Sequence, residues 1–227
     1  MNDLSSIAKY IDFTNLRNNL YLGELDNFCK EAIEYNFFGV CVLPYYVPYV
    51  VSLLKNSSTR IISVADFPYG CSLLKTKIDF VEELVKNKLD ELDFVMNVAA
   101  FINKDYKLVE EEVTSALEIC RGNNVKLKVI IETGLLLPDE IAIATRLLCD
   151  IGVDFIKTST GVAARGVKYE DVMIIKENLS GSTKIKASGG IRTLEQVMKF
   201  LELGVSRIGT SAGVEILKEL EARLNTE

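Results

Sequence analysis

Short apolar runs alternate with longer segments of mixed polarity along the whole chain. Runs of about four to eight residues rich in valine, isoleucine and leucine are typical of strands buried on both faces of a parallel sheet. Segments whose apolar positions recur every three or four residues are typical of helices that bury one face. By these criteria we expect eight strands, at residues 11–14, 39–43, 60–67, 91–98, 126–133, 154–160, 184–187 and 206–210.

Helices are expected between nearly all of these strands. The clearest is the segment 74–88, in which Ile78, Val81, Leu84 and Val85 fall on one face. The other helices are expected at residues 3–11, 24–35, 47–54, 108–120, 138–150, 169–179, 194–203 and 213–224.

This order of elements predicts the fold. A chain of 227 residues in which strands and helices alternate, with no linker and no low-complexity segment, is typical of one domain. Eight strands in such an alternation favour a (β/α)₈ TIM barrel over an open doubly wound sheet, and the dinucleotide pattern G-x-G-x-x-G is absent. We therefore expect a single (β/α)₈ barrel over residues 1–227, with its active site at the carboxyl ends of the strands.

The overall composition narrows the possible partners and the location of the protein. A hydrophobic content of 48% and a net charge of −6 indicate a globular protein without the basic surface that nucleic acid or an anionic membrane requires. The sequence has no apolar run long enough for a transmembrane helix and no basic-then-apolar start typical of a signal peptide. We expect a cytoplasmic protein that binds neither nucleic acid nor membrane.

The sequence contains no histidine. This absence excludes Ser-His-Asp and Cys-His triads and almost every catalytic zinc site. The five cysteines are scattered and form no C-x-x-C pair, which suits reduced thiols. We expect no metal and no other cofactor, and chemistry that depends on lysine, carboxylates, hydroxyls or the backbone.

Lys157 stands near the end of the predicted strand 154–160. Burial of an ammonium is unfavourable, so a lysine there either meets a carboxylate or loses its proton. A lysine that is neutral near pH 7 is a nucleophile towards carbonyl groups. The alternative is a strand-end lysine whose stem is buried while its ammonium reaches solvent.

The alternation of side chains along strands suggests that other charged side chains lie near Lys157. If the faces that carry Asp93, Lys128, Lys157 and Lys186 all point inward, four successive strands place a carboxylate and three lysines around one pocket. A second ammonium near Lys157 lowers its pKa and favours a Schiff base with an aldehyde or ketone, while Asp93 can shuttle a proton. The alternative places these charges at the bottom rim or in structural ion pairs.

Two glycine-containing turns follow the last two predicted strands. Ser188-Gly189-Gly190 and Gly209-Thr210-Ser211-Ala212-Gly213 leave backbone N–H groups open, with helix N-termini behind them. Barrel enzymes commonly hold a substrate phosphate at this place. Each turn alone is also explained as an ordinary loop or helix cap.

Several segments carry a family resemblance. Two segments resemble those of deoxyribose-phosphate aldolases most specifically: Phe155-Ile156-Lys157-Thr158-Ser159-Thr160-Gly161 and Lys186-Ala187-Ser188-Gly189-Gly190-Ile191-Arg192. Five further segments resemble the same family, and all seven stand in the family's order along the chain: the five are 40–42, 67–70, 91–97, 127–133 and 207–211. The resemblance implies a class I aldolase that reversibly cleaves 2-deoxy-D-ribose 5-phosphate to acetaldehyde and D-glyceraldehyde 3-phosphate. It also implies a homodimer that acts in the cytoplasm in deoxynucleoside breakdown.

The resemblance also implies the roles of individual residues. Lys157 is the Schiff-base lysine, Lys186 perturbs it, and Asp93 is the proton donor and acceptor. The residues expected to bind the phosphorylated substrate are Lys128, Thr158, Ser188, Gly189, Gly190, Gly209 and Ser211.

Three positions depart from the family pattern. Phe13 stands where histidine is common, Asn87-Lys88-Leu89 stands where a Gly-Ala pair is usual, and residues 162–166 replace a more glycine-rich loop. Two alternative functions stay open at this point. One is another Schiff-base barrel, such as a transaldolase-like or fructose-phosphate aldolase, and the other is a non-catalytic barrel that binds phosphosugars.

Overall fold

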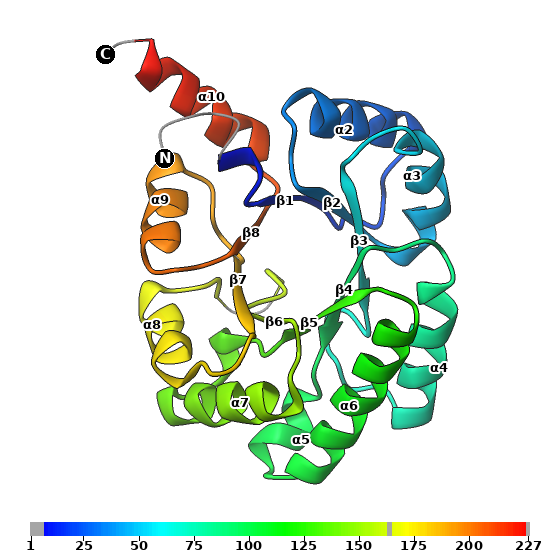
Figure 1. Ribbon diagram of the computed structural model, residues 1–227, viewed down its shortest axis with the longest axis vertical. Helices are drawn as coiled ribbons and strands as arrows, with labels where there is room; N and C mark the ends of the chain where they lie inside the picture. The colour runs from blue at the N-terminus through cyan, green and yellow to red at the C-terminus, as the bar shows by residue number, and fades with distance from the viewer. Residues whose placement is uncertain (1–6, 163–164, 226–227) are drawn as a thin grey trace.

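A computed structural model describes residues 7–162 and 165–225. These residues form a closed barrel whose eight parallel strands follow one another in chain order, with helices outside them (Figure 1). The predicted (β/α)₈ TIM barrel is therefore confirmed. The strands are β1 (Ile11–Asn15), β2 (Gly39–Val42), β3 (Arg60–Ala65), β4 (Glu91–Val95), β5 (Lys126–Ile130), β6 (Phe155–Lys157), β7 (Lys184–Ser188) and β8 (Arg207–Thr210).

The helices cover the outer face of the barrel. They are α2 (Leu22–Glu34), α3 (Val47–Leu53), α4 (Leu74–Val85), α5 (Val98–Ile102), α6 (Tyr106–Gly122), α7 (Pro138–Ile151), α8 (Tyr169–Asn178), α9 (Leu194–Glu202) and α10 (Gly213–Leu224), with short 3-10 turns η1 (Pro44–Tyr46) and η2 (Thr133–Leu135). The helix expected at 3–11 lies partly outside the described residues. Among the described residues, no helix is both long and apolar enough to cross a membrane.

Four strands end two or three residues before their predicted ends. Asp66 and Glu132 adopt left-handed backbone conformations, with φ of 51° and 53°, which end β3 and β5 before the apolar runs stop. After β4, the side chain of Asn97 accepts the N–H of Ala100 and starts the unpredicted helix α5. The strand predicted at 154–160 ends at Lys157. Most residues just past the ends of β4, β5 and β6 are buried, so burial continues from these strands into the loops at the barrel mouth.

Local signals place the helices that were predicted well. Thr193 accepts the N–H of Gln196, whose side chain accepts the N–H of Thr193 in return, so this capping box begins α9 where the sequence indicated. Helix α7 begins with Pro138 and ends at Gly152, whose φ of 84° suits glycine. Caps of this kind contribute about 1 kcal/mol each to helix stability.

The barrel interior has two unlike sides. Strands β2 and β3 contribute Cys41, Ile62 and Val64, which form a small apolar cluster separate from the main core. The main core lies between the strands and the helices. The strands on the other side of the barrel contribute charged side chains to the interior.

Candidate active site

Seven charged side chains meet inside the barrel, and we call them the ionic layer. Each is at most 6% exposed. The alternation of side chains along parallel strands in register brings them to similar depth, since Asp93 lies beside Lys128 and Lys157 beside Lys186. The members are Asp12 from β1, Glu91 and Asp93 from β4, Lys128 from β5, Lys157 from β6, Lys186 from β7 and Arg207 from β8.

Asp93 is the centre of the ionic layer. Its Oδ2 accepts hydrogen bonds from Lys157 Nζ and Lys186 Nζ, each at 2.7 Å. Its Oδ1 accepts a hydrogen bond from Lys128 Nζ at 2.8 Å. The convergence that the sequence predicted for these four side chains is observed, and they form neither a bottom rim nor separate pairs.

The other three members escaped the sequence analysis. Asp12 binds Lys186 Nζ at 2.5 Å and Arg207 Nη1 at 2.8 Å. Glu91 lies 2.8 Å from Arg207 Nη1 and 2.7 Å from Lys128 Nζ. Because Glu91 shares its strand face with Asp93, alternation alone could have identified Glu91. Neither the strand of Asp12 nor that of Arg207 contains a charged residue that the sequence analysis had assigned to the site, so alternation could not identify these two.

The charges of the ionic layer balance only if one lysine is neutral. Its members are four basic and three acidic side chains, so full ionisation leaves one uncompensated positive charge in a buried site, which is unfavourable. Burial lowers the pKa of Lys157, and the charge of Lys186 lowers it further against the opposing pull of Asp93. Burial thus contributes more than the neighbouring ammonium that the sequence analysis emphasised. Lys157 is the member best suited to be neutral.

The neighbours of Lys157 keep their charges. Burial disfavours the charge of Lys186, but Asp12 and Asp93 outweigh this effect and raise its pKa. Burial also disfavours the charge of Asp93, yet the ammoniums of Lys128, Lys157 and Lys186 hold its pKa well below the usual range. The pKa values of two lysines bound to one oxygen are therefore shifted in opposite directions, an arrangement typical of sites for proton transfer.

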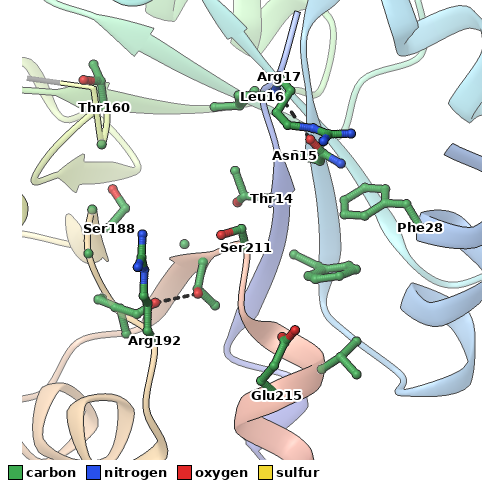
Figure 2. Close-up of a pocket in the computed structure, with 18 of the residues that line it drawn as sticks. Thr14, Asn15, Leu16, Arg17, Phe28, Thr160, Ser188, Arg192, Ser211 and Glu215 are labelled. Carbon is green, nitrogen blue, oxygen red and sulfur yellow. Dashed lines mark hydrogen bonds between the residues drawn. The ribbon is translucent and has the colours of Figure 1, made fainter. Parts of the chain in front are cut away.

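A cavity of about 800 Å³ opens above the ionic layer at the carboxyl ends of β1, β6, β7 and β8. Lys157 lines it, whereas the other six members of the ionic layer do not. Figure 2 shows the walls, with Thr14 and Leu16 on one side of the open space and Thr160 and Ser188 on the other. Lys157 is therefore the one charged group of this layer, among the described residues, that can meet a molecule in the cavity.

The two glycine turns also line this cavity, at Ser188, Gly189, Gly190, Gly209 and Ser211. Gly189 and Gly190 have φ of 93° and 80°, which suit glycine and leave the backbone uncovered by side chains.

Arg192, which the sequence analysis did not single out as a binding residue, lines the cavity beside Ser188 (Figure 2). It forms no ion pair with any other described residue. An unpaired guanidinium beside exposed backbone amides suits an anion such as a phosphate.

Two of the expected substrate-binding residues lie elsewhere. Lys128 is fully buried and bound to Glu91 and Asp93 beneath the cavity floor. Thr158 is also fully buried, and its hydroxyl accepts the N–H of Ser188 at 3.1 Å, which ties β6 to the turn after β7. The structure gives both residues contacts that support the cavity without lining it.

The departures at Phe13 and at residues 87–89 have structural explanations. Phe13 follows Asp12 on β1, so it lies on the opposite face of the strand, where it stacks on Phe28 with 4.4 Å between ring centroids. Both residues are at most 6% exposed and border the cavity, so an aromatic side chain serves here as core beside the cavity. Lys88 has a φ of 60°, a conformation that explains why glycine is usual in this turn.

The loop 162–166 falls partly outside the described residues, 163 and 164 being undescribed. Within it, Arg165 binds Asp171 through both terminal nitrogens, at 2.6 and 3.0 Å. The next residue, Gly166, packs so closely on Gly189 that a Cβ there would lie 2.2 Å from the carbonyl oxygen of Gly189. Gly166 therefore buttresses the glycine turn, while Val162, at the other end of this loop, lines the cavity itself.

Within the described part of the chain, no group of three or more histidine, cysteine, aspartate or glutamate side chains is arranged to hold a metal ion.

Comparisons with known proteins indicate an aldolase, a class of enzyme that the geometry of the site suits. A family model described as "DeoC/LacD family aldolase" matches residues 6–219. The chain is 42% identical to "Deoxyribose-phosphate aldolase" of Caldicellulosiruptor saccharolyticus over 94% of its length and 97% of that protein.

Two solved structures are also similar to this chain. A putative deoxyribose-phosphate aldolase from Coccidioides immitis matches with a TM-score of 0.92 and 35% identity, covering 96% of this chain and 87% of that one. A deoxyribose phosphate aldolase from Aeropyrum pernix, described as having a unique tetrameric structure, matches with a TM-score of 0.90 and 25% identity, covering 98% and 94%.

Proposed function

The chain belongs to the DeoC/LacD family of aldolases, and from that premise we propose the reaction and the residues that perform it. The protein is a carbon–carbon lyase that reversibly cleaves 2-deoxy-D-ribose 5-phosphate into acetaldehyde and D-glyceraldehyde 3-phosphate. One observation supports this proposal most directly: Lys157, its pKa lowered by burial, alone connects the ionic layer to the cavity.

Lys157 is the nucleophile in this proposal. Its neutral Nζ attacks C1 of the open-chain sugar phosphate, and loss of the carbonyl oxygen as water gives an iminium. Departure of the proton from the C3 hydroxyl lets the C2–C3 bond break, with its electron pair moving to C2. D-glyceraldehyde 3-phosphate leaves and an enamine stays on Lys157. Protonation at C2 and addition of water then release acetaldehyde and restore the amine.

Asp93 holds the reacting nitrogen and balances its charge. Its Oδ2 lies 2.7 Å from Lys157 Nζ, so the carboxylate stabilises the positive iminium at the place where that charge develops. Asp93 is fully buried and does not line the cavity, so its proton path to the substrate passes through a water molecule. Lys186, kept positive by Asp12 and Asp93, favours the free amine of Lys157 before the substrate binds.

The glycine turns and Arg192 hold the phosphate in this proposal. Lys157 and the turns line the same cavity, so a sugar bound covalently at C1 can extend its 5-phosphate towards Gly189, Gly190 and Ser211. Backbone amides and the guanidinium of Arg192 suit a dianion. Because the substrate is held at C1 by Lys157 and at its phosphate by the turns, the C2–C3 bond between these two points is aligned for cleavage.

Covalent trapping tests the proposal. The protein is reduced with borohydride in the presence of acetaldehyde, and its peptides are mapped by mass. We expect the label on the peptide of Lys157 alone and no label in Lys157→Arg. Equal labelling of Lys186 would refute the assignment.

A parallel reaction with dihydroxyacetone phosphate or fructose phosphates separates this function from a transaldolase-like or fructose-phosphate aldolase. The absence of any trapped adduct would favour the non-catalytic binding protein.

We also propose a homodimer that acts in the cytoplasm in deoxynucleoside breakdown, as the family resemblance implies. Sedimentation of the purified protein tests the oligomeric state, and a tetramer like that described for the Aeropyrum pernix protein would correct it.

A further inference from the structure

A second group of buried charges lies outside the ionic layer, between helices α4 and α6. The side chain of Lys77 is 0% exposed and that of Glu112 is 1% exposed, and Lys77 Nζ donates a hydrogen bond to Glu112 Oε2 at 2.9 Å. Lys77 Nζ also lies 4.3 Å from the centre of the Phe94 ring. Replacement of a buried ion pair by apolar side chains is often neutral or stabilising, so stability alone does not account for this pair.

The pair connects the loops that follow two adjacent strands. Lys77 Nζ donates a hydrogen bond to the carbonyl of Gly70 at 3.0 Å and lies 3.5 Å from the carboxylate of Asp66. Both residues belong to the loop after β3. Glu112 Oε1 accepts the N–H of Asn97, just after β4, at 2.6 Å. One ion pair thus fixes both ends of the loop 66–70 and the chain that continues from Asp93.

The loop held in this way forms a wall of the catalytic cavity. Phe67 lines the cavity of about 800 Å³ that Lys157 also lines, and it lines a second cavity of about 260 Å³ as well. Asp66 and Lys77 line that second cavity as well. Phe67 therefore borders two spaces and also packs against the apolar cluster of Cys41, Ile62 and Val64, so its position depends on the loop that carries it as well as on this packing.

We propose that Lys77 and Glu112 are positioning residues that hold the loop 66–70 so that Phe67 stays in place as a wall of the substrate cavity. This inference rests on the proposed function, because it takes that cavity as the site for the sugar phosphate. Neither residue lines the cavity or belongs to the ionic layer. The pair acts on substrate binding through Phe67 and leaves the amine of Lys157 unchanged.

The double variant Lys77→Met/Glu112→Gln tests the proposal. It removes both charges of the pair together, and glutamine can still accept the N–H of Asn97. Asp66 loses a cation at 3.5 Å, but its side chain is 12% exposed and keeps the hydrogen bonds donated by the N–H and hydroxyl of Ser72. We expect the KM for 2-deoxy-D-ribose 5-phosphate to rise about tenfold while kcat changes by less than about threefold, since uniform substrate binding is what is lost. The alkaline rise of the pH–rate profile should stay where it is in the parent.

Hydrogen exchange gives a readout that needs no activity. The N–H of Gly70 is donated to the Asp66 carbonyl at 2.8 Å, and the N–H of Ser72 to the Asp66 carboxylate at 3.1 Å. Both amides should exchange faster in the double variant. The matched control is Lys75→Met, which removes an exposed lysine, 84% exposed and paired with Asp79, from the same helix. Its KM and exchange should equal those of the parent.

The outcomes are distinct. Unchanged exchange at these two amides, or an unchanged KM, overturns the inference. A lower melting temperature with neither change assigns the pair to stability alone and overturns it as well. If the parent does not cleave the sugar phosphate, the proposed function fails and exchange alone decides. Should the double variant not fold, Glu112→Gln is measured in the same way, with the same changes expected in smaller amount.

Discussion

Replacement of Lys186 by methionine removes one of the two ammoniums that share Asp93. Methionine fills a similar volume in a side-chain site that is fully buried, so the change is mainly one of charge. Lys186 contributes to the lowered pKa of Lys157, whereas Asp93 opposes it. Without Lys186, the full negative charge of Asp93 acts on Lys157. The pKa of Lys157 should therefore rise.

The magnitude follows from the distances. Lys157 Nζ and Lys186 Nζ each lie 2.7 Å from the same oxygen, so they are separated by at most twice that length, about 5.4 Å. At an effective dielectric constant of about 20, two like charges at that separation repel by about 3 kcal/mol. Loss of this repulsion reduces the neutral fraction of Lys157 near neutral pH by about a hundredfold. We expect kcat/KM to fall by a similar factor.

The assay is the pH–rate profile of substrate cleavage from neutral to alkaline pH, for the parent and for Lys186→Met. The alkaline rise should move to higher pH in the variant, and part of the lost activity should return there. Lys128→Met is the matched control, because it also removes a buried ammonium from Asp93, but from Oδ1, the oxygen that Lys157 does not contact. Its rise should move less. If the rise in Lys186→Met coincides with that of the parent, charge repulsion from Lys186 does not set the protonation of Lys157, and the reasoning is refuted.

Three further predictions test other parts of the description. Exhaustive chelation should leave activity unchanged, because the proposed reaction uses only side chains and water; activity lost to a chelator and restored by zinc would contradict it. Gly189→Ala should raise the KM for the 5-phosphate about tenfold and leave the KM for unphosphorylated 2-deoxyribose unchanged, since a methyl group at φ of 93° lies 3.1 Å from the facing loop. Equal changes for the two sugars would place the phosphate elsewhere. Phe13→His should destabilise the fold by about 2 kcal/mol, because it buries a polar ring between Phe28 and Phe37. Its melting temperature should fall by about 5 °C with no shift in the pH–rate profile.

The sequence predicted the fold and the centre of the site for a clear physical reason. Parallel strands buried on both faces leave little room for charge, so Asp93, Lys128, Lys157 and Lys186 were conspicuous on successive strands. The contacts of Asp12 were not predictable, because its main partner Lys186 lies on a strand at the far end of the chain. Closure of the barrel between β1 and β8 brings the two together.

Boundaries and cavity walls were harder to predict. A single left-handed residue, such as Asp66 or Glu132, ends a strand inside an apolar run, and no alternation of side chains reveals it. Arg192 and Phe67 line the cavity from loops whose approach depends on the finished barrel. Lys77 was passed over since a lysine on an amphipathic helix is ordinarily exposed, and only the packing of α4 against α6 shows that it is buried.

The ionic layer joins side chains from six of the eight strands, with every acidic member touching at least two basic ones. Loss of any acidic member leaves an uncompensated positive charge in the middle of the barrel, whereas simultaneous loss of one acid and one base keeps the balance. Evolutionary drift at these positions is therefore expected to be epistatic: a substitution at Asp12 or Glu91 becomes tolerable only beside a compensating change. A library that randomises one acidic position at a time should yield almost no functional variants, whereas a library that varies acid–base pairs together should yield some.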